Sequence, residues 1–219
     1  MNSRELLEKL KNDAPQLLTN LPNAFGIYAL WDHEEEIRYI GCTPKAKEGF
    51  RIRVGNKHVT GSEGRSHKFS QAYCTGRMWR YCKKLDPVAA LNAQDPNDAR
   101  LAKKLRTLFI REYCRITYVE IPSKEREGDY FTLLTNLESQ IQSLAPASMR
   151  LWEGIGFSPM EEPTSLVDAL LEQHSSLREA AEKQATIYRK YVRLGDSAIA
   201  QLGAAADRLS GAVRLQIVR

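Results

Sequence analysis

The chain has 219 residues, of which 42% are hydrophobic and 27% charged, a composition typical of a globular protein. No stretch approaches the roughly 18 consecutive apolar residues of a membrane-spanning helix, and the charged N-terminus differs from the apolar core of a signal peptide. We therefore expect a cytoplasmic protein with no membrane partner. The four cysteines show no CxxC spacing, which predicts reduced thiols and argues against a zinc site.

The net charge of +5 conceals an uneven distribution of charge along the chain. Residues 38–115 contain 18 lysines and arginines and 6 acidic residues, whereas the remainder contains 14 basic and 21 acidic residues. A local excess of this size favours a polyanionic partner, because basic side chains that neutralise phosphates release counterions. An ordinary solvated basic surface is the alternative, so charge alone leaves a nucleic-acid partner open.

The first predicted elements are one helix and two strands. An amphipathic pattern predicts a helix over residues 3–12, with Ser3 as its N-cap. Two runs rich in Ile, Tyr and Trp, at 25–31 and 36–42, predict strands joined by a polar loop.

The middle of the chain is predicted to contain two helices and a third strand. The stretch 43–66 is rich in Gly, Lys and Arg, and its centre, "GFRIRVGNKH", is either a short helix or an ordered loop. Apolar residues at helical spacing predict a helix over 67–85, and a turn-rich segment with two Asp-Pro pairs follows at 86–98. A basic helix over 99–113 then leads to a strand over 114–122.

The last third of the chain is predicted to be mainly helical. The stretch "DYFTLLTNLESQIQSLAP" repeats apolar residues every three or four positions, which predicts a helix, and an irregular segment follows it. From Ser165, two further helical patterns separated by Gly195 predict an α-helical hairpin. Such a hairpin is too thin to bury its own apolar stripe, so it must pack on the main domain or on a second copy of the chain.

Together these elements predict an α+β protein: a small three-stranded antiparallel sheet flanked by helices, followed by a C-terminal α-helical hairpin. We divide the chain into an N-terminal helical arm (1–22), a central domain with basic insertions (23–163) and the C-terminal helical hairpin (164–219). A homodimer formed through the C-terminal helices is one expectation.

Each of the first two predicted strands carries a tyrosine tied to a glycine, in the triplets "GIY" and "YIG". If the hairpin is centred between His33 and Glu34, Tyr28 lies directly opposite Tyr39, with Cβ atoms roughly 5 Å apart. Glycine at position 41 would let another group approach the second strand closely. Taken alone, paired tyrosines are most often a half-buried structural pair.

The residues that follow the two triplets suggest a family. With ten residues between its two tyrosines, the chain resembles the GIY-YIG nucleases over about residues 24–146. In motif spacing it is most similar to the catalytic domain of homing endonucleases, and in size to GIY-YIG restriction endonucleases. Members of the family carry an arginine, a histidine and a glutamate after the triplets, and the matching residues here are Arg53, His58 and Glu138.

The resemblance implies that Glu138 is the sole protein ligand of one Mg²⁺ or Mn²⁺ ion. The residue pattern independently marks this position, because Glu138 stands between Leu137 and Ile141 on an otherwise apolar helix face. An unpaired carboxylate there would be costly to bury, so a cation should face it. A surface glutamate on a slightly rotated helix is the alternative.

The resemblance also implies the roles of the other catalytic candidates. Arg53 would contact the scissile phosphate, with Arg51 as its competitor, because a guanidinium binds phosphate oxygens in a bidentate manner. His58 follows Arg53 by five residues, where the family often shows four, and would assist proton transfer or bind a phosphate. Tyr28 would activate the attacking water, and Tyr39 would orient it or hold a phosphate.

DNA is the expected partner. Two Lys/Arg-rich insertions, 43–66 and 86–106, are suited to contacting the duplex. The predicted DNA-binding residues are Arg51, Lys57, Arg65, His67, Lys68, Lys103 and Lys104.

The resemblance therefore implies a metal-dependent endonuclease that hydrolyses DNA phosphodiester bonds, of the restriction, defence or mobile-element type. In one respect the chain departs from the family: many members have an asparagine some fifteen residues after the glutamate, and position 153 is Glu. One alternative is a catalytically silent nucleic-acid-binding module with the GIY-YIG fold. Another is a structural adaptor that acts through the helical hairpin, although this would leave the basic block unexplained.

Overall fold

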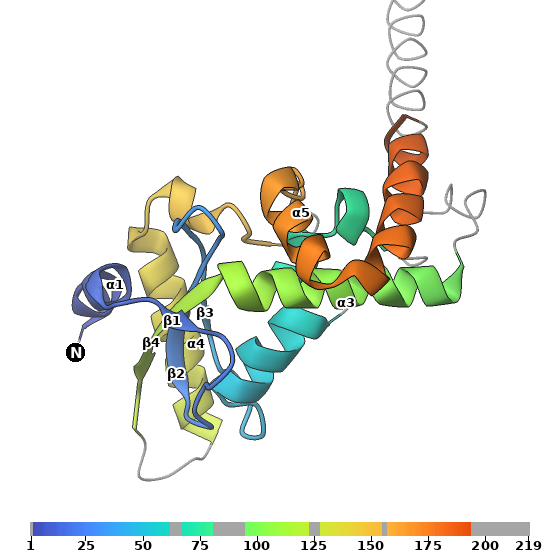
Figure 1. The fold of residues 1–219 in the computed structure, drawn as a ribbon. Coiled ribbons are helices and arrows are strands. Elements are labelled where there is room, and N and C mark those ends of the chain that lie inside the picture. The colour runs from blue at the N-terminus through green and yellow to red at the C-terminus, as the bar shows by residue number, and fades with distance from the viewer. Residues whose placement is uncertain (1, 62–66, 81–94, 123–127, 155–156, 194–219) are drawn as a thin grey trace, which may run out of the picture.

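The structure is a computed structural model that describes residues 2–61, 67–80, 95–122, 128–154 and 157–193 (Figure 1). The second helix of the predicted C-terminal hairpin therefore lies outside the described residues, as does Arg65. Within the described part of the chain, no helix is long and apolar enough to cross a membrane.

The core of the fold is an antiparallel sheet of four strands in the order β1-β4-β2-β3. Three of them, β2 (Gly26–Trp31), β3 (Ile37–Cys42) and β4 (Arg115–Glu120), are the predicted strands. The α+β class is therefore confirmed, while the count of three strands was one too few. The additional strand, β1 (Gln16–Leu17), has two exposed residues and pairs with β4, so its sequence carries no pattern that could have predicted it.

Helices cover both faces of this sheet (Figure 1). On one face, α1 (Ser3–Asn12) and α4 (Gly128–Leu144) pack against the sheet and each other. The opposite face packs into a second core that includes side chains of α3 (Pro96–Tyr113) and of η1 (Arg51–His58). Along β2, side chains alternate between the two cores, as a period of two requires.

The N-terminal segment is part of this packing. Leu6, Leu7 and Leu10 of α1 are buried in the same core as α4 side chains, and β1 extends the sheet. The predicted bounds of the α1 helix are correct, but its N-cap is Asn2 and not Ser3, because the Asn2 side chain and Glu5 form a capping box.

The helix predicted over 67–85 is wrong within the described residues. Helix α2 (Lys68–Ala72) ends early, and the short 3₁₀-helix η2 (Gly76–Met78) follows it. Gly76 has a φ angle of 50°, a left-handed conformation that an α-helix does not accommodate. By contrast, α3 extends the predicted basic helix by three residues, because Asp95 caps it and Pro96 occupies its first turn.

The first helix of the predicted C-terminal hairpin is interrupted. Helix α5 (Thr164–Gln173) stops at His174, the 3₁₀-helix η5 (Ser175–Leu177) follows, and a further helix spans 178–193. The backbone of His174 leaves the helical region, and the helix after it runs in a different direction (Figure 1).

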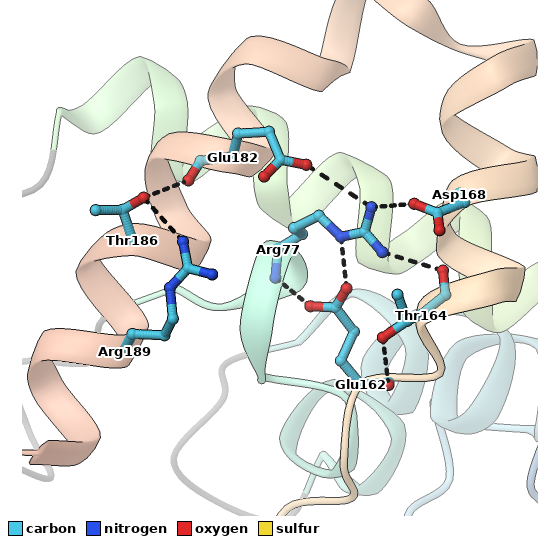
Figure 2. Close-up of polar contacts among 7 residues, drawn as sticks. All are labelled: Arg77, Glu162, Thr164, Asp168, Glu182, Thr186 and Arg189. Atoms are coloured by element: carbon cyan, nitrogen blue, oxygen red, sulfur yellow. Dashed lines mark hydrogen bonds and ion pairs between the residues drawn. The ribbon is translucent and has the colours of Figure 1, made fainter.

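A buried arginine joins this C-terminal part to the main fold (Figure 2). Arg77 of η2 is 7% exposed; its Nε and its backbone N–H each donate to Glu162 over 2.5 Å. Its other guanidinium nitrogens contact Asp168, the Thr164 carbonyl oxygen (3.0 Å) and Glu182 (3.7 Å). One side chain thus connects η2 to α5 and to helix 178–193.

Replacing Arg77 with methionine should lower the free energy of unfolding by about 2–3 kcal/mol, because it leaves the poorly exposed Glu162 carboxylate without a cation. Urea denaturation measures this change. The matched control is Arg189→Met on helix 178–193, since Arg189 is exposed and should cost less than about 0.5 kcal/mol. Equal costs for both variants would contradict a structural role for the Arg77 network.

Candidate active site

The two tyrosines lie on the same face of the β2–β3 hairpin but do not pair directly. The register places Tyr28 opposite Gly41 and Leu30 opposite Tyr39, so the predicted direct pairing of the tyrosines is wrong. The turn is centred on Glu34, half a residue later than predicted, and a bulge after Leu30 brings the total shift of the centre to one residue. The tyrosines are therefore diagonal neighbours, with ring centroids 6.2 Å apart.

The turn that sets this register is built around a buried aspartate. Asp32 is fully buried, and its carboxylate accepts hydrogen bonds from the backbone N–H groups of Glu34 (2.8 Å) and Glu36 (3.0 Å). Arg38 Nε donates to the same carboxylate over 2.5 Å. Glu35 has a φ angle of 61°, which closes the turn without the Asn-Gly signal that usually marks a hairpin.

The absence of a side chain at Gly41 leaves the space that the rings of Tyr28 and Tyr39 occupy. A Cβ atom at this position would lie 2.5 Å from Cε1 of Tyr39 and 2.6 Å from the hydroxyl oxygen of Tyr28. Any side chain at position 41 would therefore displace two rings. The close approach predicted for this glycine is made by the two tyrosines themselves.

Gly41→Ala is expected to lower the free energy of unfolding by about 1–3 kcal/mol, because the added methyl overpacks the two rings. Urea denaturation measures the loss. Gly55→Ala in η1 is the matched control: its nearest neighbour would be 3.2 Å from the new Cβ, so the change should stay within about 1 kcal/mol. A loss no larger than that of the control would contradict the tight placement of the rings.

His58 holds Tyr28 from within the protein. Its ring is fully buried, and its Nε2 lies 2.8 Å from the Tyr28 hydroxyl oxygen. Its Nδ1 accepts the backbone N–H of Lys68 over 2.9 Å, so in the neutral ring the proton is on Nε2 and is donated to Tyr28. Burial, followed by the charge of Arg53, holds the pKa of His58 well below its usual value, so the ring is neutral. With both nitrogens engaged, neither is available to bind a phosphate.

The segment that carries Arg53 and His58 is a π-helix, η1 (Arg51–His58). Of the two sequence-based alternatives for this stretch, the helix is the one observed, and Gly55 does not interrupt it. In a π-helix each residue bonds to the fifth residue along, so residues five apart share a face. The five-residue spacing therefore lets Arg53 and His58 both face Tyr28.

Arg53 is half-buried beside the two tyrosines. Its Nε is buried and has no hydrogen-bond partner among the described residues. Burial opposes its charge, but interactions with Tyr28, Tyr39 and Glu138 outweigh it and raise the pKa of the guanidinium. Its competitor Arg51 is exposed.

Glu138 reaches the site from α4, at the edge of the sheet. One carboxylate oxygen accepts the Tyr39 hydroxyl (3.4 Å), and the other accepts the thiol of Cys42 (2.9 Å). Tyr39 and Cys42 belong to opposite faces of β3, so the half-buried carboxylate lies beside this edge strand. On the helix, Gln142 donates to the Ile40 carbonyl oxygen over 2.8 Å, which fixes α4 against β3.

A divalent ion at Glu138 would have few protein ligands. Among the described residues, no group of three or more His, Cys, Asp or Glu side chains could hold a metal ion. The half-buried carboxylate nevertheless suits a hard cation such as Mg²⁺, which keeps several waters and accepts one or two carboxylates. The residues present therefore fit a one-carboxylate site.

Both tyrosines are neutral phenols in this arrangement. Burial is the main cause that raises the pKa of Tyr28 and of Tyr39, and the Glu138 carboxylate adds to it. Arg53 acts in the opposite direction at both rings. Either phenol would need more positive charge nearby before it could lose its proton at neutral pH.

The predicted DNA-binding residues divide by exposure. Arg51 and Lys104 are exposed, Lys103 and His67 are half-buried, and Lys57 is paired with Glu48 over 2.6 Å. Lys68 differs from all of these because it is buried, at 4% exposure. It faces the site and not an open surface.

Sequence reasoning missed the role of Cys42 in this site. It directly follows the "YIG" triplet, so the period of two along a strand places it on the face opposite Tyr39, toward α4. That alternation was the available signal.

Comparison with known proteins identifies no relative: no protein-family model, curated protein or solved structure matches the chain.

Proposed function

We propose that this protein is a metal-dependent endonuclease of the GIY-YIG type that hydrolyses phosphodiester bonds in DNA. The observation that carries the proposal is the convergence of four chemically suited side chains from four separate elements. These are Tyr28 of β2, Tyr39 of β3, Arg53 of η1 and Glu138 of α4. The two tyrosine rings lie 6.2 Å apart, the Tyr39 hydroxyl lies 3.4 Å from the Glu138 carboxylate, and the charge of Arg53 acts on both phenols. Their roles follow from the chemistry of each side chain.

Arg53 is suited to bind the scissile phosphate. Its buried Nε–H has no partner among the described residues, and a guanidinium can donate two parallel hydrogen bonds to phosphate oxygens. Glu138 would hold Mg²⁺ or Mn²⁺, which supplies positive charge at the phosphate. The Arg53 guanidinium and a metal ion at Glu138 would together stabilise the negative charge that develops on the phosphate in the transition state.

Once its own proton has been lost to solvent, Tyr28 is suited, as a phenolate, to accept a proton from the attacking water. Its hydroxyl oxygen receives a hydrogen bond from His58 Nε2, and Arg53 favours the charged form of the phenol. Both interactions stabilise a phenolate, although burial opposes it in the free protein. His58 thus acts on the reaction through Tyr28, as a positioning residue. The expected products carry a 5′-phosphate and a 3′-hydroxyl.

The test is the cleavage of supercoiled plasmid DNA by the purified protein in Mg²⁺ and, separately, in EDTA. Nicked or linear DNA that forms only with Mg²⁺ would support the proposal. Discrete fragments would point to a sequence-specific enzyme of the restriction type, and a smear to a non-specific one. The Gly41→Ala protein, purified in the same way, controls for a contaminating nuclease, because displaced tyrosine rings should slow cleavage.

Salt-sensitive DNA binding without cleavage would overturn the proposal and favour a catalytically silent binding module. If the protein neither binds nor cleaves DNA, both the nuclease and the binding module are excluded.

A further inference from the structure

Lys68 is a buried cation at the wall of the candidate site. Its Nζ donates to the Gly154 carbonyl oxygen and lies 5.0 Å from the ring centre of Tyr39 and 5.3 Å from that of Phe157. Its backbone N–H fixes the ring of His58, which in turn holds Tyr28. Lys68 therefore contacts Tyr39 through its side chain and His58, the partner of Tyr28, through its backbone.

Burying the Lys68 ammonium group at this position is unfavourable for the stability of the fold. Among the described residues, its direct partners are one carbonyl oxygen and two rings, and none is a carboxylate. Burying a cation without a paired anion costs several kcal/mol, whereas methionine would fill similar space without that cost. A purely structural role does not explain a charged group here.

A second cation, Arg53, lies near Lys68, and it forms no close ion pair with any residue that the structure describes. The positive charge of Arg53 disfavours the charged form of Lys68, so the two groups repel each other across the site. Two cations held together in a partly buried place are stabilised when an anion lies between them. A phosphate group has the charge and the oxygen atoms for that place.

Resting on the proposed nuclease function, we propose that Lys68 and Arg53 together hold the scissile phosphate, with Lys68 acting from the Tyr39 side. Lys68 is then part of the phosphate site and not one of the general contacts to the DNA backbone. It differs in this from the exposed Lys104 on α3.

The pH dependence of DNA affinity should reveal whether Lys68 binds the phosphate. Burial, followed by repulsion from Arg53, lowers the pKa of Lys68 to about 8, while Glu153 and Glu138 act in the opposite direction. Tyr39 has a pKa raised well above its usual value, and the pKa of Arg53 is also raised, so neither titrates near pH 8. Below about pH 8 the ammonium is charged and binds phosphate; as the pH rises through that value, the charge and the affinity are lost.

The experiment measures two quantities between pH 6.5 and 9.5: DNA affinity in EDTA, by fluorescence anisotropy with a short duplex, and cleavage rate in Mg²⁺. We expect Lys68→Met to lower cleavage at pH 7 by about 100-fold or more and affinity by about 3- to 10-fold. We also expect it to abolish the fall in affinity near pH 8. Lys68→Arg should retain affinity above pH 8, because a guanidinium stays charged.

The matched control is Lys9→Met, because Lys9 is an exposed residue of α1 and is not part of the candidate site. This variant should change neither the DNA affinity nor the cleavage rate. The proposal is overturned if Lys68→Met cleaves at the wild-type rate, or if its affinity falls near pH 8 as the wild-type affinity does. If Lys68→Met does not fold in a thermal melt, the wild-type and Lys68→Arg pH profiles decide, and identical profiles overturn the proposal.

The affinity measurement separates this proposal from the nuclease itself. If the wild type never cleaves DNA, the nuclease function fails, yet a Lys68-dependent loss of affinity near pH 8 would still support a phosphate held by Lys68. If the wild type cleaves and the Lys68 variants behave like it, only the role of Lys68 fails.

Discussion

Replacing Glu138 with glutamine is expected to lower the rate of DNA cleavage by about 10³-fold or more, because a divalent ion contributes several kcal/mol to transition-state stabilisation. Glutamine keeps an oxygen that can accept the Cys42 thiol or the Tyr39 hydroxyl, so the packing of α4 on β3 should survive. The measurement is plasmid cleavage over a range of Mg²⁺ concentrations, with a thermal melt of each protein.

Glu172→Gln on α5 is the matched control, since Glu172 is exposed and lies on a different element. It should cleave at the wild-type rate. Cleavage by Glu138→Gln at that rate would remove Glu138 from the chemistry, and full rescue by more Mg²⁺ would mean that the carboxylate only weakly assists ion binding.

Most of the sheet could be predicted from the sequence because its signals are local. Strands β2, β3 and β4 are short runs rich in β-branched and aromatic residues, which are enriched in strands. The hairpin register could not be predicted in the same way. It depends on the buried Asp32 turn and on a bulge after Leu30, and both depend on contacts that a period-two pattern does not encode.

The helices show the same division between local and long-range causes. The predicted helix over 67–85 has apolar residues at the right spacing, but Gly76 and the partners of Arg77 break it. Those partners, Glu162 and Asp168, lie about ninety residues away in the chain. Spacing alone could not reveal that a distant carboxylate determines the local backbone.

For the candidate site, the sequence indicated the residues but not their environments. Tyr28, Arg53 and Glu138 were singled out by residue type and order, and the structure brings them together. The burial of Lys68 and the contact of Cys42 with Glu138 depend on how helices close over the edge of the sheet. The exposure of a side chain depends on how the whole chain packs. The sequence alone therefore does not distinguish the buried Lys68 from a lysine on the surface.

Arg53→Met is expected to lower the rate of DNA cleavage by about 10³-fold, because it removes the guanidinium that faces both tyrosines and would bind the phosphate. Methionine keeps most of the apolar stem of the side chain, so η1 should still form. The measurement is the cleavage rate of plasmid DNA under single-turnover conditions, so that substrate binding and chemistry are separated.

The neighbouring Arg51→Met provides a sharp control. Both arginines lie on η1 two residues apart, but Arg51 is exposed, whereas Arg53 is half-buried and its Nε has no hydrogen-bond partner in the described part of the chain. We expect Arg51→Met to weaken DNA binding by less than about tenfold and to reduce its salt dependence, as the loss of one backbone contact should. The chemical step in the bound complex should be unchanged. Arg53→Lys should remain slow, because an ammonium cannot donate the two parallel hydrogen bonds of a guanidinium. If Arg51→Met instead lost the chemical step and Arg53→Met kept it, the phosphate would be bound on the exposed face of η1, and the site would have to be rebuilt around that face.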